Sequence, residues 1–298
     1  MNRMLIIGAG GLIGGKFKDL AGENFEVFGT YNTHHVEGEN MFHLNAVNRQ
    51  ETFALIRKLS PDVVVDTHSL NNVDYCETHR EEAWSINVDG VKNIAEACKD
   101  NGAKIIFFST DYVFDGKKMK YTEKDKPRPL NYLGMNKMVA EQMLYGLDIN
   151  HIIVRTSVVY GSGGLNKINF VLWLIQKLRA KEKVSIVTDQ KNNPTFVDNI
   201  VSQVLALHRK NRTGIYHIAG SECLSRYDFS LKIANVFKLD TNLITPITTS
   251  DLHQIARRPM VVNMSVAKVE KETGLKQDDV YTGLNKLKQQ LEATNADL

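Results

Sequence analysis

A series of short runs of bulky apolar residues constrains this fold most strongly: "MLIIG", "DVVVDT", "KIIFFST" and "HIIVRTS". None of them alternates polar with apolar residues, so each predicts a strand buried on both faces, as in a parallel sheet. Segments of helical periodicity lie between them, such as "RQETFALIRKL" and the stretch from Glu77 to Lys99. This alternation predicts an α/β fold, a doubly wound, Rossmann-like parallel sheet with right-handed crossovers.

The glycine-rich segment "IIGAGGLIGG" follows the first predicted strand and opens a predicted helix. Gly8, Gly11 and Gly14 recur at three-residue spacing, which lets the backbone turn tightly and approach a diphosphate. The helix N-terminus adds unpaired N–H groups and a partial positive charge. Because the loop starts an alternating strand–helix series, it favours a dinucleotide site over a turn of purely structural importance.

The end of the second predicted strand, "FGTYNTHH", bears on which dinucleotide is bound. A site that prefers NAD usually places a carboxylate about 20 residues after the glycine loop, on the ribose hydroxyls. This segment has no Asp or Glu, and it has no Arg or Lys for a 2′-phosphate. His34 and His35 are the remaining candidates for that phosphate, although loop histidines are more often simply exposed. We therefore favour NADP(H) and keep NAD(H) open.

The strand–helix rhythm becomes looser after Tyr160, where the loop "GSGG" begins. Helical segments such as "NFVLWLIQKLRAKE" and "VDNIVSQVLALHRK" then alternate with the short strands "KVSIV" and "GIYHIA". We predict a dinucleotide-binding domain over residues 1–160. A smaller C-terminal substrate-binding region over residues 161–298 is expected to be interleaved with the sheet.

Composition argues against several classes of protein. The formal net charge is +3 over 298 residues, without a dense Lys/Arg run, which argues against a nucleic-acid partner. Cys76, Cys98 and Cys223 are far apart, which argues against disulfides and favours a reducing, cytoplasmic compartment. No apolar run is long enough to cross a membrane, and the nine scattered histidines predict no metal site.

Longer motifs give the chain a family resemblance. With "STDYVFDG", "YTEKDKPRPLN", "RTSVVYG" and "DQKNNPTFVDNIV", it resembles an extended short-chain dehydrogenase/reductase of the dTDP-4-dehydrorhamnose reductase family. The resemblance implies an NAD(P)H-dependent oxidoreductase that reduces a nucleotide-linked 4-keto-6-deoxy sugar in dTDP-rhamnose biosynthesis. The methionine adenosyltransferase regulatory subunit shares these motifs. A regulatory dinucleotide-binding subunit with a partner enzyme, a nucleotide-sugar epimerase and a homodimer therefore stay open.

The same resemblance assigns roles to individual residues. Thr110 is expected to hydrogen-bond the substrate carbonyl, and Lys137 is expected to hold the nicotinamide ribose. The diphosphate is expected at Gly8, Gly11, Leu12, Ile13 and Gly14. Further cofactor contacts are expected from Thr30, Asn45, Thr67, His68 and Ser69. Asn45 stands where the family often has aspartate, and the bulky His68 stands where it has a small alanine, so we expect crowding there.

The segment "PLNYLGMNKMVAEQML" departs from the family at one important position. The proton for the sugar oxygen normally comes from a tyrosine four residues before the lysine, but Leu133 occupies that place and Tyr132 lies one residue earlier. At about 100° per residue, Leu133 neighbours Lys137 on the helix. Tyr132 falls within an apolar stripe containing Met135 and Val139, which predicts that this stripe, with Tyr132, faces the core. A catalytic role for Tyr132 is the alternative, because helix ends fray.

Several other residues have predicted roles. Asp111 is expected to hydrogen-bond a local turn, with weak proton donation as the alternative. Tyr160 is expected to be packed. The loop Asn192–Thr195 is expected beside the substrate pocket. Arg257 or Arg258 is expected either to meet the substrate diphosphate or to form a salt bridge, because guanidinium suits both anions.

Overall fold

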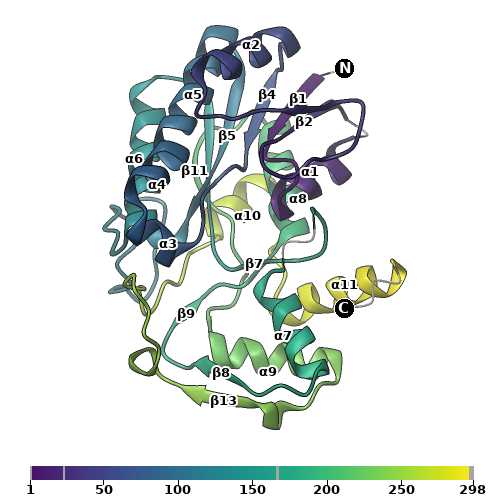
Figure 1. Ribbon diagram of the computed structural model, residues 1–298, viewed down its shortest axis with the longest axis vertical. Coiled ribbons are helices and arrows are strands. Elements are labelled where there is room, and N and C mark those ends of the chain that lie inside the picture. Colours follow the sequence, from purple (N-terminus) through teal and green to yellow (C-terminus); the bar gives the residue numbers. More distant parts are fainter. Residues whose placement is uncertain (1, 23, 166–167, 295–298) are drawn as a thin grey trace.

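The computed structural model describes residues 2–22, 24–165 and 168–294. At its centre is a sheet in the strand order β11-β6-β5-β4-β1-β2-β3, with every neighbouring pair parallel (Figure 1). The chain therefore starts in the middle of the sheet, runs to one edge and then continues to the other. The strands are β1 (Asn2–Ile7), β2 (Phe25–Tyr31), β3 (Met41–His43), β4 (Val63–Asp66), β5 (Lys104–Thr110), β6 (His151–Thr156) and β11 (Gly214–His217).

Helices cover both faces of this sheet, which confirms the predicted doubly wound α/β fold (Figure 1). One face is covered by α1 (Leu12–Ala21), α8 (Val197–Arg209) and α10 (Ala267–Thr273). The other face is covered by α2 (Arg49–Leu59), α5 (Gly90–Asn101) and α6 (Tyr132–Gly146).

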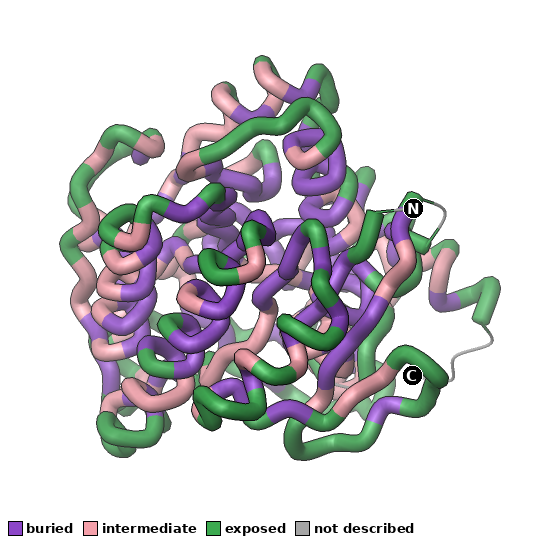
Figure 2. Tube along the Cα trace, turned by 90° about the horizontal axis from the view of Figure 1, so that it is seen from above, coloured by how far each residue is buried: buried purple, intermediate pink, exposed green. Residues whose placement is uncertain are grey.

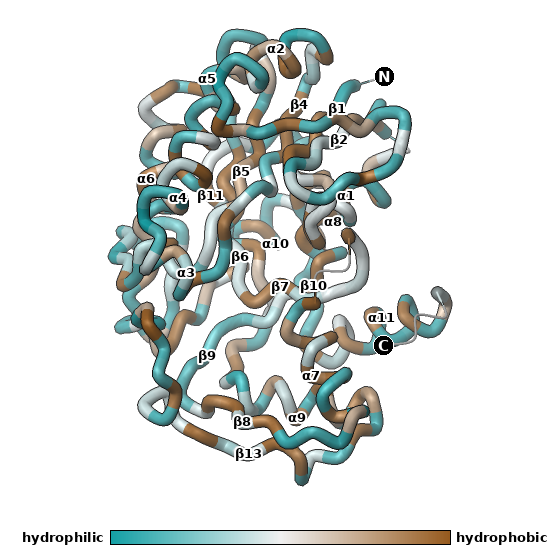
Figure 3. Tube along the Cα trace, in the orientation of Figure 1, coloured by the Kyte–Doolittle hydropathy of each residue, from teal (hydrophilic) through white to brown (hydrophobic). Residues whose placement is uncertain are grey.

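Each face of the sheet carries its own hydrophobic layer, because side chains alternate along a strand. In β1, Met4 and Ile6 pack in the layer under α1 and α8, whereas Leu5 and Ile7 pack under α2, α5 and α6. All four are at most 2% exposed. Figure 2 shows the buried strands inside the molecule, and Figure 3 shows hydrophobic residues concentrated along them. Burial on both faces explains the uninterrupted apolar runs of the sequence.

A smaller lobe lies at the lower end of Figure 1 and has a separate core. The short pairs β7–β10 and β9–β12 link it to the main sheet region. Strand β11 lies in sequence between segments of this lobe but pairs with β6. The predicted division at residue 160, with interleaved segments, stays a prediction. Tyr160 is 1% exposed, as expected. The remaining elements are β7 (Val159–Tyr160), α7 (Phe170–Arg179), β8 (Val184–Val187), β9 (Lys191–Asn192), β10 (Thr195–Phe196), β12 (Leu224–Ser225), α9 (Arg226–Phe237), η3 (Thr241–Leu243), β13 (Ile244–Ile247), η4 (Thr249–Asp251) and α11 (Val280–Ala293).

The predicted long helix from Glu77 to Lys99 is interrupted, so the prediction was wrong in detail. Helix α3 (Val73–Thr78) ends at His79, whose φ of −122° and ψ of 61° are not helical. Helix α4 (Arg80–Trp84) then leads into a π-helical turn, η1 (Ser85–Asp89), before α5 begins. π-helical turns are rare and frequently occur at functional sites.

Helix α6 buries a different face from the one predicted. Met135, Val139 and Tyr132 are only half-buried, whereas Lys137 and Glu141 are 5% and 3% exposed. The physical reason is a buried ion pair: Glu141 accepts hydrogen bonds from Arg155 Nε at 2.9 Å and from Ser109 Oγ at 2.5 Å. Charged residues can take the inward face of α6 because their polar groups find partners inside the protein. The helical-wheel prediction assumed that only apolar residues form that face.

Buried His217 should make stability depend on pH. Its side chain is fully buried beside Phe114, and burial, with the charge of Arg155 second, lowers its pKa from 6.5 to about 3. Below pH 6.5 the unfolded chain therefore takes up a proton that the folded chain does not, so stability is lost as pH falls toward 3. Between pH 7.5 and 5, His217 should account for a loss of about 2 kcal/mol in the free energy of unfolding.

Urea unfolding at both pH values measures this loss. The variant His217→Phe should show a shallower pH dependence than the wild type, and His253→Phe, at an exposed histidine, serves as the matched control. Equal pH dependence in the wild type and His217→Phe would show that His217 takes up its proton in the folded state as well.

Candidate active site

The glycine loop between β1 and α1 forms a tight turn that is braced from two strands. Gly8 has φ +87°, and its carbonyl accepts the Gly11 N–H at 3.0 Å. Thr30 Oγ1 accepts the Gly8 N–H at 3.2 Å, and Thr67 Oγ1 donates to the Ile7 and Gly8 carbonyls. A Cβ placed on Gly14 would lie 2.3 Å from the Gly8 carbonyl oxygen, so this close approach requires glycine.

The start of α1 fits a bound diphosphate. Gly11 is the N-cap and supplies no side-chain cap, and the first turn contains no acidic residue. The N–H groups of Leu12, Ile13 and Gly14 are therefore available to an anion, which the helix dipole also favours. The observed cradle thus suits a dinucleotide.

The other predicted cofactor residues occupy different positions around this loop. Thr30 and Thr67 hold the loop itself, as described above. Asn45 is exposed and accepts the Val47 N–H at 3.1 Å, and Ser69 donates to Asn87 Oδ1 at 3.1 Å. Their contacts to a cofactor stay predictions.

His68 lies two residues after the end of β4, and crowding of a cofactor by its ring stays a prediction. The ring turns into the protein, with Nδ1 against Asp66 Oδ1 and Nε2 3.0 Å from the Ile86 carbonyl oxygen in the π turn η1. A Cβ on Gly90 would lie 2.8 Å from this Nε2, so Gly90 makes the space for the ring. The side chain is 14% exposed.

Lys137 lies close to the end of β5, as the predicted pairing with Thr110 requires. Its Nζ donates to the Phe108 carbonyl at 3.0 Å, two residues before Thr110 and thus about 7 Å along the strand. Burial lowers the pKa of Lys137 to about 8, against the raising influence of Asp66. The sheet therefore brings an ammonium group of reduced proton affinity close to the carboxyl end of β5.

Thr110 and Asp111 form a small hydrogen-bonded turn. Thr110 Oγ1 donates to Asp111 Oδ1 at 3.1 Å and accepts the Tyr112 N–H at 3.2 Å, which caps the 3₁₀ helix η2 (Asp111–Val113). Asp111 also accepts from Ser157 Oγ at 2.6 Å, and burial raises the pKa of its carboxyl. These contacts agree with the expected local role of Asp111.

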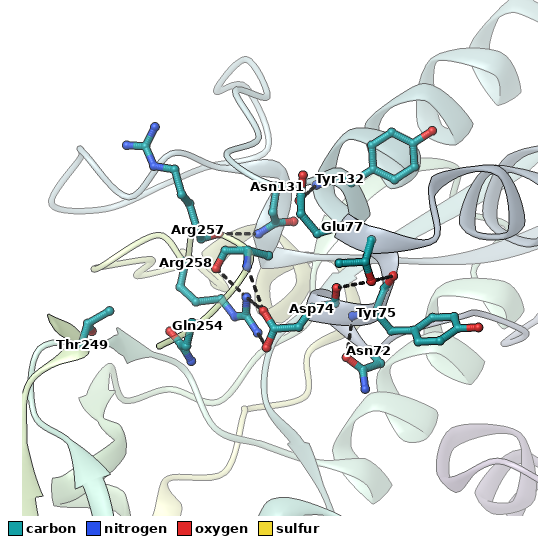
Figure 4. A network of polar contacts seen from close by, with 12 residues as sticks. Asn72, Asp74, Tyr75, Glu77, Asn131, Tyr132, Thr249, Gln254, Arg257 and Arg258 are labelled. Atoms are coloured by element: carbon teal, nitrogen blue, oxygen red, sulfur yellow. Dashed lines mark hydrogen bonds and ion pairs between the residues drawn. The ribbon is translucent and has the colours of Figure 1, made fainter. Parts of the chain in front are cut away.

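The tyrosine and leucine at the start of α6 pack in one apolar cluster but are buried to different extents. Leu133 is 4% exposed and packs in an apolar cluster with Cys76 and Ala83, on the same buried face as Lys137. Tyr132 is half-buried; the Arg80 guanidinium lies 5.1 Å from its ring centroid. Figure 4 shows the Tyr132 phenol pointing away from the Asp74–Arg258 pair. Tyr132 therefore packs at the edge of this apolar cluster, in partial agreement with its predicted core position, and Leu133 fills the inward place.

The two candidate diphosphate-binding arginines differ. Arg258 makes two hydrogen bonds to the Asp74 carboxylate, at 2.9 and 3.0 Å, so it forms the salt bridge that was the alternative prediction (Figure 4). Arg257 is exposed, its guanidinium points away from this network, and its carbonyl accepts from Asn131 Nδ2 at 2.9 Å (Figure 4). A phosphate contact stays a prediction for Arg257.

The loop Asn192–Thr195 is held by structural hydrogen bonds. Asn193 donates to the Gly220 carbonyl and accepts the Met264 N–H, and Thr195 Oγ1 donates to the Ser157 carbonyl at 2.7 Å. These two side chains therefore fasten the small lobe to the sheet, and substrate contact by the loop stays a prediction.

The sequence reasoning missed Tyr112 and Arg226. Burial and the neighbouring Asp111 raise the pKa of Tyr112, so its phenol stays neutral and can donate a hydrogen bond. Arg226 begins α9, and its guanidinium lies 5.0 Å from the Phe170 ring centroid. Tyr112 belongs to the "STDYVFDG" motif, but nothing in that motif indicates that the tyrosine is buried. Arg226 follows Ser225, whose helix-capping role indicates the start of a helix but not a ligand contact.

The described residues contain neither a membrane-spanning helix nor a metal-binding cluster. No helix within 2–22, 24–165 or 168–294 is long and apolar enough to cross a membrane. Within the same ranges, no cluster of three or more His, Cys, Asp or Glu side chains could hold a metal ion.

A glycine cradle at the first helix and a parallel doubly wound sheet are the features of an extended short-chain dehydrogenase/reductase. Within this class, the chain belongs to the family described as RmlD substrate binding domain, whose model matches residues 1–293.

Individual relatives agree with this family. The chain is 32% identical to the dTDP-4-dehydrorhamnose reductase of Aggregatibacter actinomycetemcomitans, over 97% of this chain and 99% of that protein. It is 28% identical to methionine adenosyltransferase 2 subunit beta of Bos taurus, over 90% and 81%. A crystal structure of dTDP-4-dehydrorhamnose reductase from Bacillus anthracis in complex with NADP superposes with a TM-score of 0.88, at 27% identity, over 97% of this chain and 100% of that one.

Proposed function

We propose that this protein is an oxidoreductase that uses NADP(H) to reduce a nucleotide-linked 4-keto-6-deoxy sugar. The observation that carries the proposal is the buried Lys137 ammonium, fixed on the Phe108 carbonyl beside Thr110 at the carboxyl end of β5. The reductases from Aggregatibacter actinomycetemcomitans and Bacillus anthracis support this reaction type, and the NADP in the latter supports the cofactor. The absence of a carboxylate in "FGTYNTHH" also favours NADP(H) over NAD(H).

In this proposal the α1 N–H groups, Thr110 and Lys137 have different roles. The N–H groups at the start of α1 bind the diphosphate of the cofactor, which supplies the hydride when bound. The Thr110 hydroxyl donates a hydrogen bond to the ketone oxygen, and Lys137 stabilises the negative charge that develops on that oxygen. Lys137 lies in a buried site, so its charge acts there more strongly than it would in water.

A catalytically weakened regulatory subunit is the second candidate. The observation that favours it is Leu133, which fills the place of the acid with a hydrocarbon side chain packed against Cys76 and Ala83. The similarity to methionine adenosyltransferase 2 subunit beta supports it as well. General acid–base assistance is worth about 10²–10⁴-fold, so losing the tyrosine alone leaves measurable catalysis.

The test is NADPH oxidation, followed by absorbance, with dTDP-4-dehydrorhamnose as substrate. We expect turnover that saturates with the sugar and is faster with NADPH than with NADH. Cofactor binding without turnover would support the regulatory candidate, and a new sugar without net NADPH oxidation would identify an epimerase.

A further inference from the structure

The reduction of a ketone needs a proton, and the position that normally supplies it is occupied by Leu133. Lys137 donates to the Phe108 carbonyl, two residues before Thr110 on the same strand. Its ammonium has three N–H groups, and one of them binds the Phe108 carbonyl. An ammonium that gives up its proton more readily than usual is suited to act as an acid near neutral pH.

Asp66 lies beside Lys137. In the β4–β5 register Asp66 is opposite Phe107, and Lys137 Nζ lies 4.8 Å from the centroid of the Phe107 ring. Both charged groups therefore occupy the face of the sheet under α5 and α6. Asp66 is 1% exposed, and its Oδ2 has no hydrogen-bond partner among the described residues. A buried carboxylate oxygen without a protein partner marks a position for a bridging water.

The other oxygen of Asp66 is held by His68. Both ring nitrogens of His68 face acceptors, Nδ1 the Asp66 carboxylate and Nε2 the Ile86 carbonyl at 3.0 Å. Each contact is a hydrogen bond only when the nitrogen concerned carries a proton. Gly90 and the π turn η1 shape its pocket, and the 14% exposure of the side chain gives access to solvent.

The other titratable groups nearby leave Asp66 as the available carboxylate. Cys76 of α3 and Glu141 of α6 face Lys137, and Cys98 of α5 faces Asp66. Burial raises the pKa of both thiols, so they stay uncharged. Glu141 is already neutralised by Arg155, with Nη2–Oε2 at 2.5 Å.

We propose that the Lys137 ammonium is the acid of this site and that Asp66 and His68 return its proton. The proposal rests on the proposed reductase function. The ketone carbon is reduced by hydride, its oxygen forms an O–H bond, and a Lys137 N–H bond breaks to leave a neutral amine. The His68 Nδ1–H bond then breaks and Asp66 becomes a neutral carboxylic acid, which reorients so that its new O–H faces the bridging water and passes that proton through the water to the Lys137 amine. The neutral imidazole takes a proton from solvent, so each ketone consumes one solvent proton.

Imidazole rescue of His68→Ala tests this path. The substitution empties the pocket at Gly90, so kcat should fall about 10–100-fold with little change in KM, and added imidazole should restore most of it. Asp66→Asn should lower kcat similarly, without rescue. The wild-type rate should fall as pH rises through about 8, where Lys137 loses its proton. His253→Ala, at an exposed histidine, is the control and should behave as the wild type.

A readout independent of activity is the protonation state of His68, measured by NMR on protein labelled with ¹⁵N-histidine at pH 7.5. The relay requires both nitrogens of His68 to be protonated, with the second proton lost in Asp66→Asn. A singly protonated His68 would overturn the relay even in an inactive protein. Unchanged turnover in His68→Ala would overturn the relay but not the reductase function. The same holds if Tyr112→Phe loses both its turnover and the dependence of the rate on pH. The failure of every keto sugar to react would instead overturn the proposed function and, with it, the catalytic role of the relay.

Discussion

Gly14→Val should abolish dinucleotide binding, raising Kd for NADPH by about 100-fold or more. A Cβ at this position would lie 2.3 Å from the Gly8 carbonyl oxygen, 2.9 Å from Thr67 Oγ1 and 3.0 Å from Ala9 Cα. Two of these neighbours are backbone atoms, so the loop or the whole of α1 would have to move. The N–H groups at the start of α1 would then lose their alignment on the diphosphate. Fluorescence titration with NADPH measures the effect.

The control for this variant is Gly22→Ala, because a Cβ on Gly22 would meet nothing within 4 Å. It should bind NADPH as tightly as the wild type. Circular dichroism and thermal unfolding establish that Gly14→Val is folded, and Gly14→Ala provides a milder variant with the same clash. A folded Gly14→Val protein with an unchanged Kd would place the dinucleotide elsewhere.

The main features of the fold were predictable from sequence because they depend on local patterns. Strands buried on both faces give unbroken apolar runs, and "KIIFFST" and "RQETFALIRKL" coincide with β5 and α2 as observed. Elements after residue 240, such as β13 and α11, were not predicted. β13 is short and pairs with β8 far away in sequence, so its stability comes from tertiary contacts that no local pattern contains.

Predictions for the site failed where buried polar groups decide the structure. The helical wheel assigned the apolar stripe with Met135 to the core, but Glu141 and Arg155 satisfy each other inside and reverse the face. The contacts of the His68 ring could not be predicted, because Ile86 and Gly90 lie about 20 residues away in sequence, in or next to a π turn that the helical pattern conceals. The spacing of Leu133 and Lys137, in contrast, follows from helix geometry alone and agrees with the structure.

Exchanging the two residues at the start of α6, Tyr132→Leu with Leu133→Tyr, should increase kcat for keto-sugar reduction by about 100-fold. Position 133 shares the buried face of Lys137, four residues away, so a phenol there gains an ammonium neighbour that favours its deprotonated form. General acid assistance typically contributes about 10²–10⁴-fold, and the lower end applies because Lys137 already donates a proton under our proposal. Steady-state NADPH oxidation measures the gain.

Two matched variants separate the effect of the phenol hydroxyl at position 133 from the effect of its ring. Leu133→Phe adds a ring of nearly the same size without the phenol, so it should pay the overpacking cost of about 1–3 kcal/mol against Cys76 and Ala83 without any gain in rate. Tyr132→Leu alone removes the ring beside Arg80, a contact worth about 0.5–1 kcal/mol at an exposed site, and should leave kcat unchanged. A large loss of activity in Tyr132→Leu would mean that Tyr132 reaches the substrate after all. An exchanged protein that binds NADPH but gains no activity would mean that the site lacks more than the acid, as a regulatory subunit would.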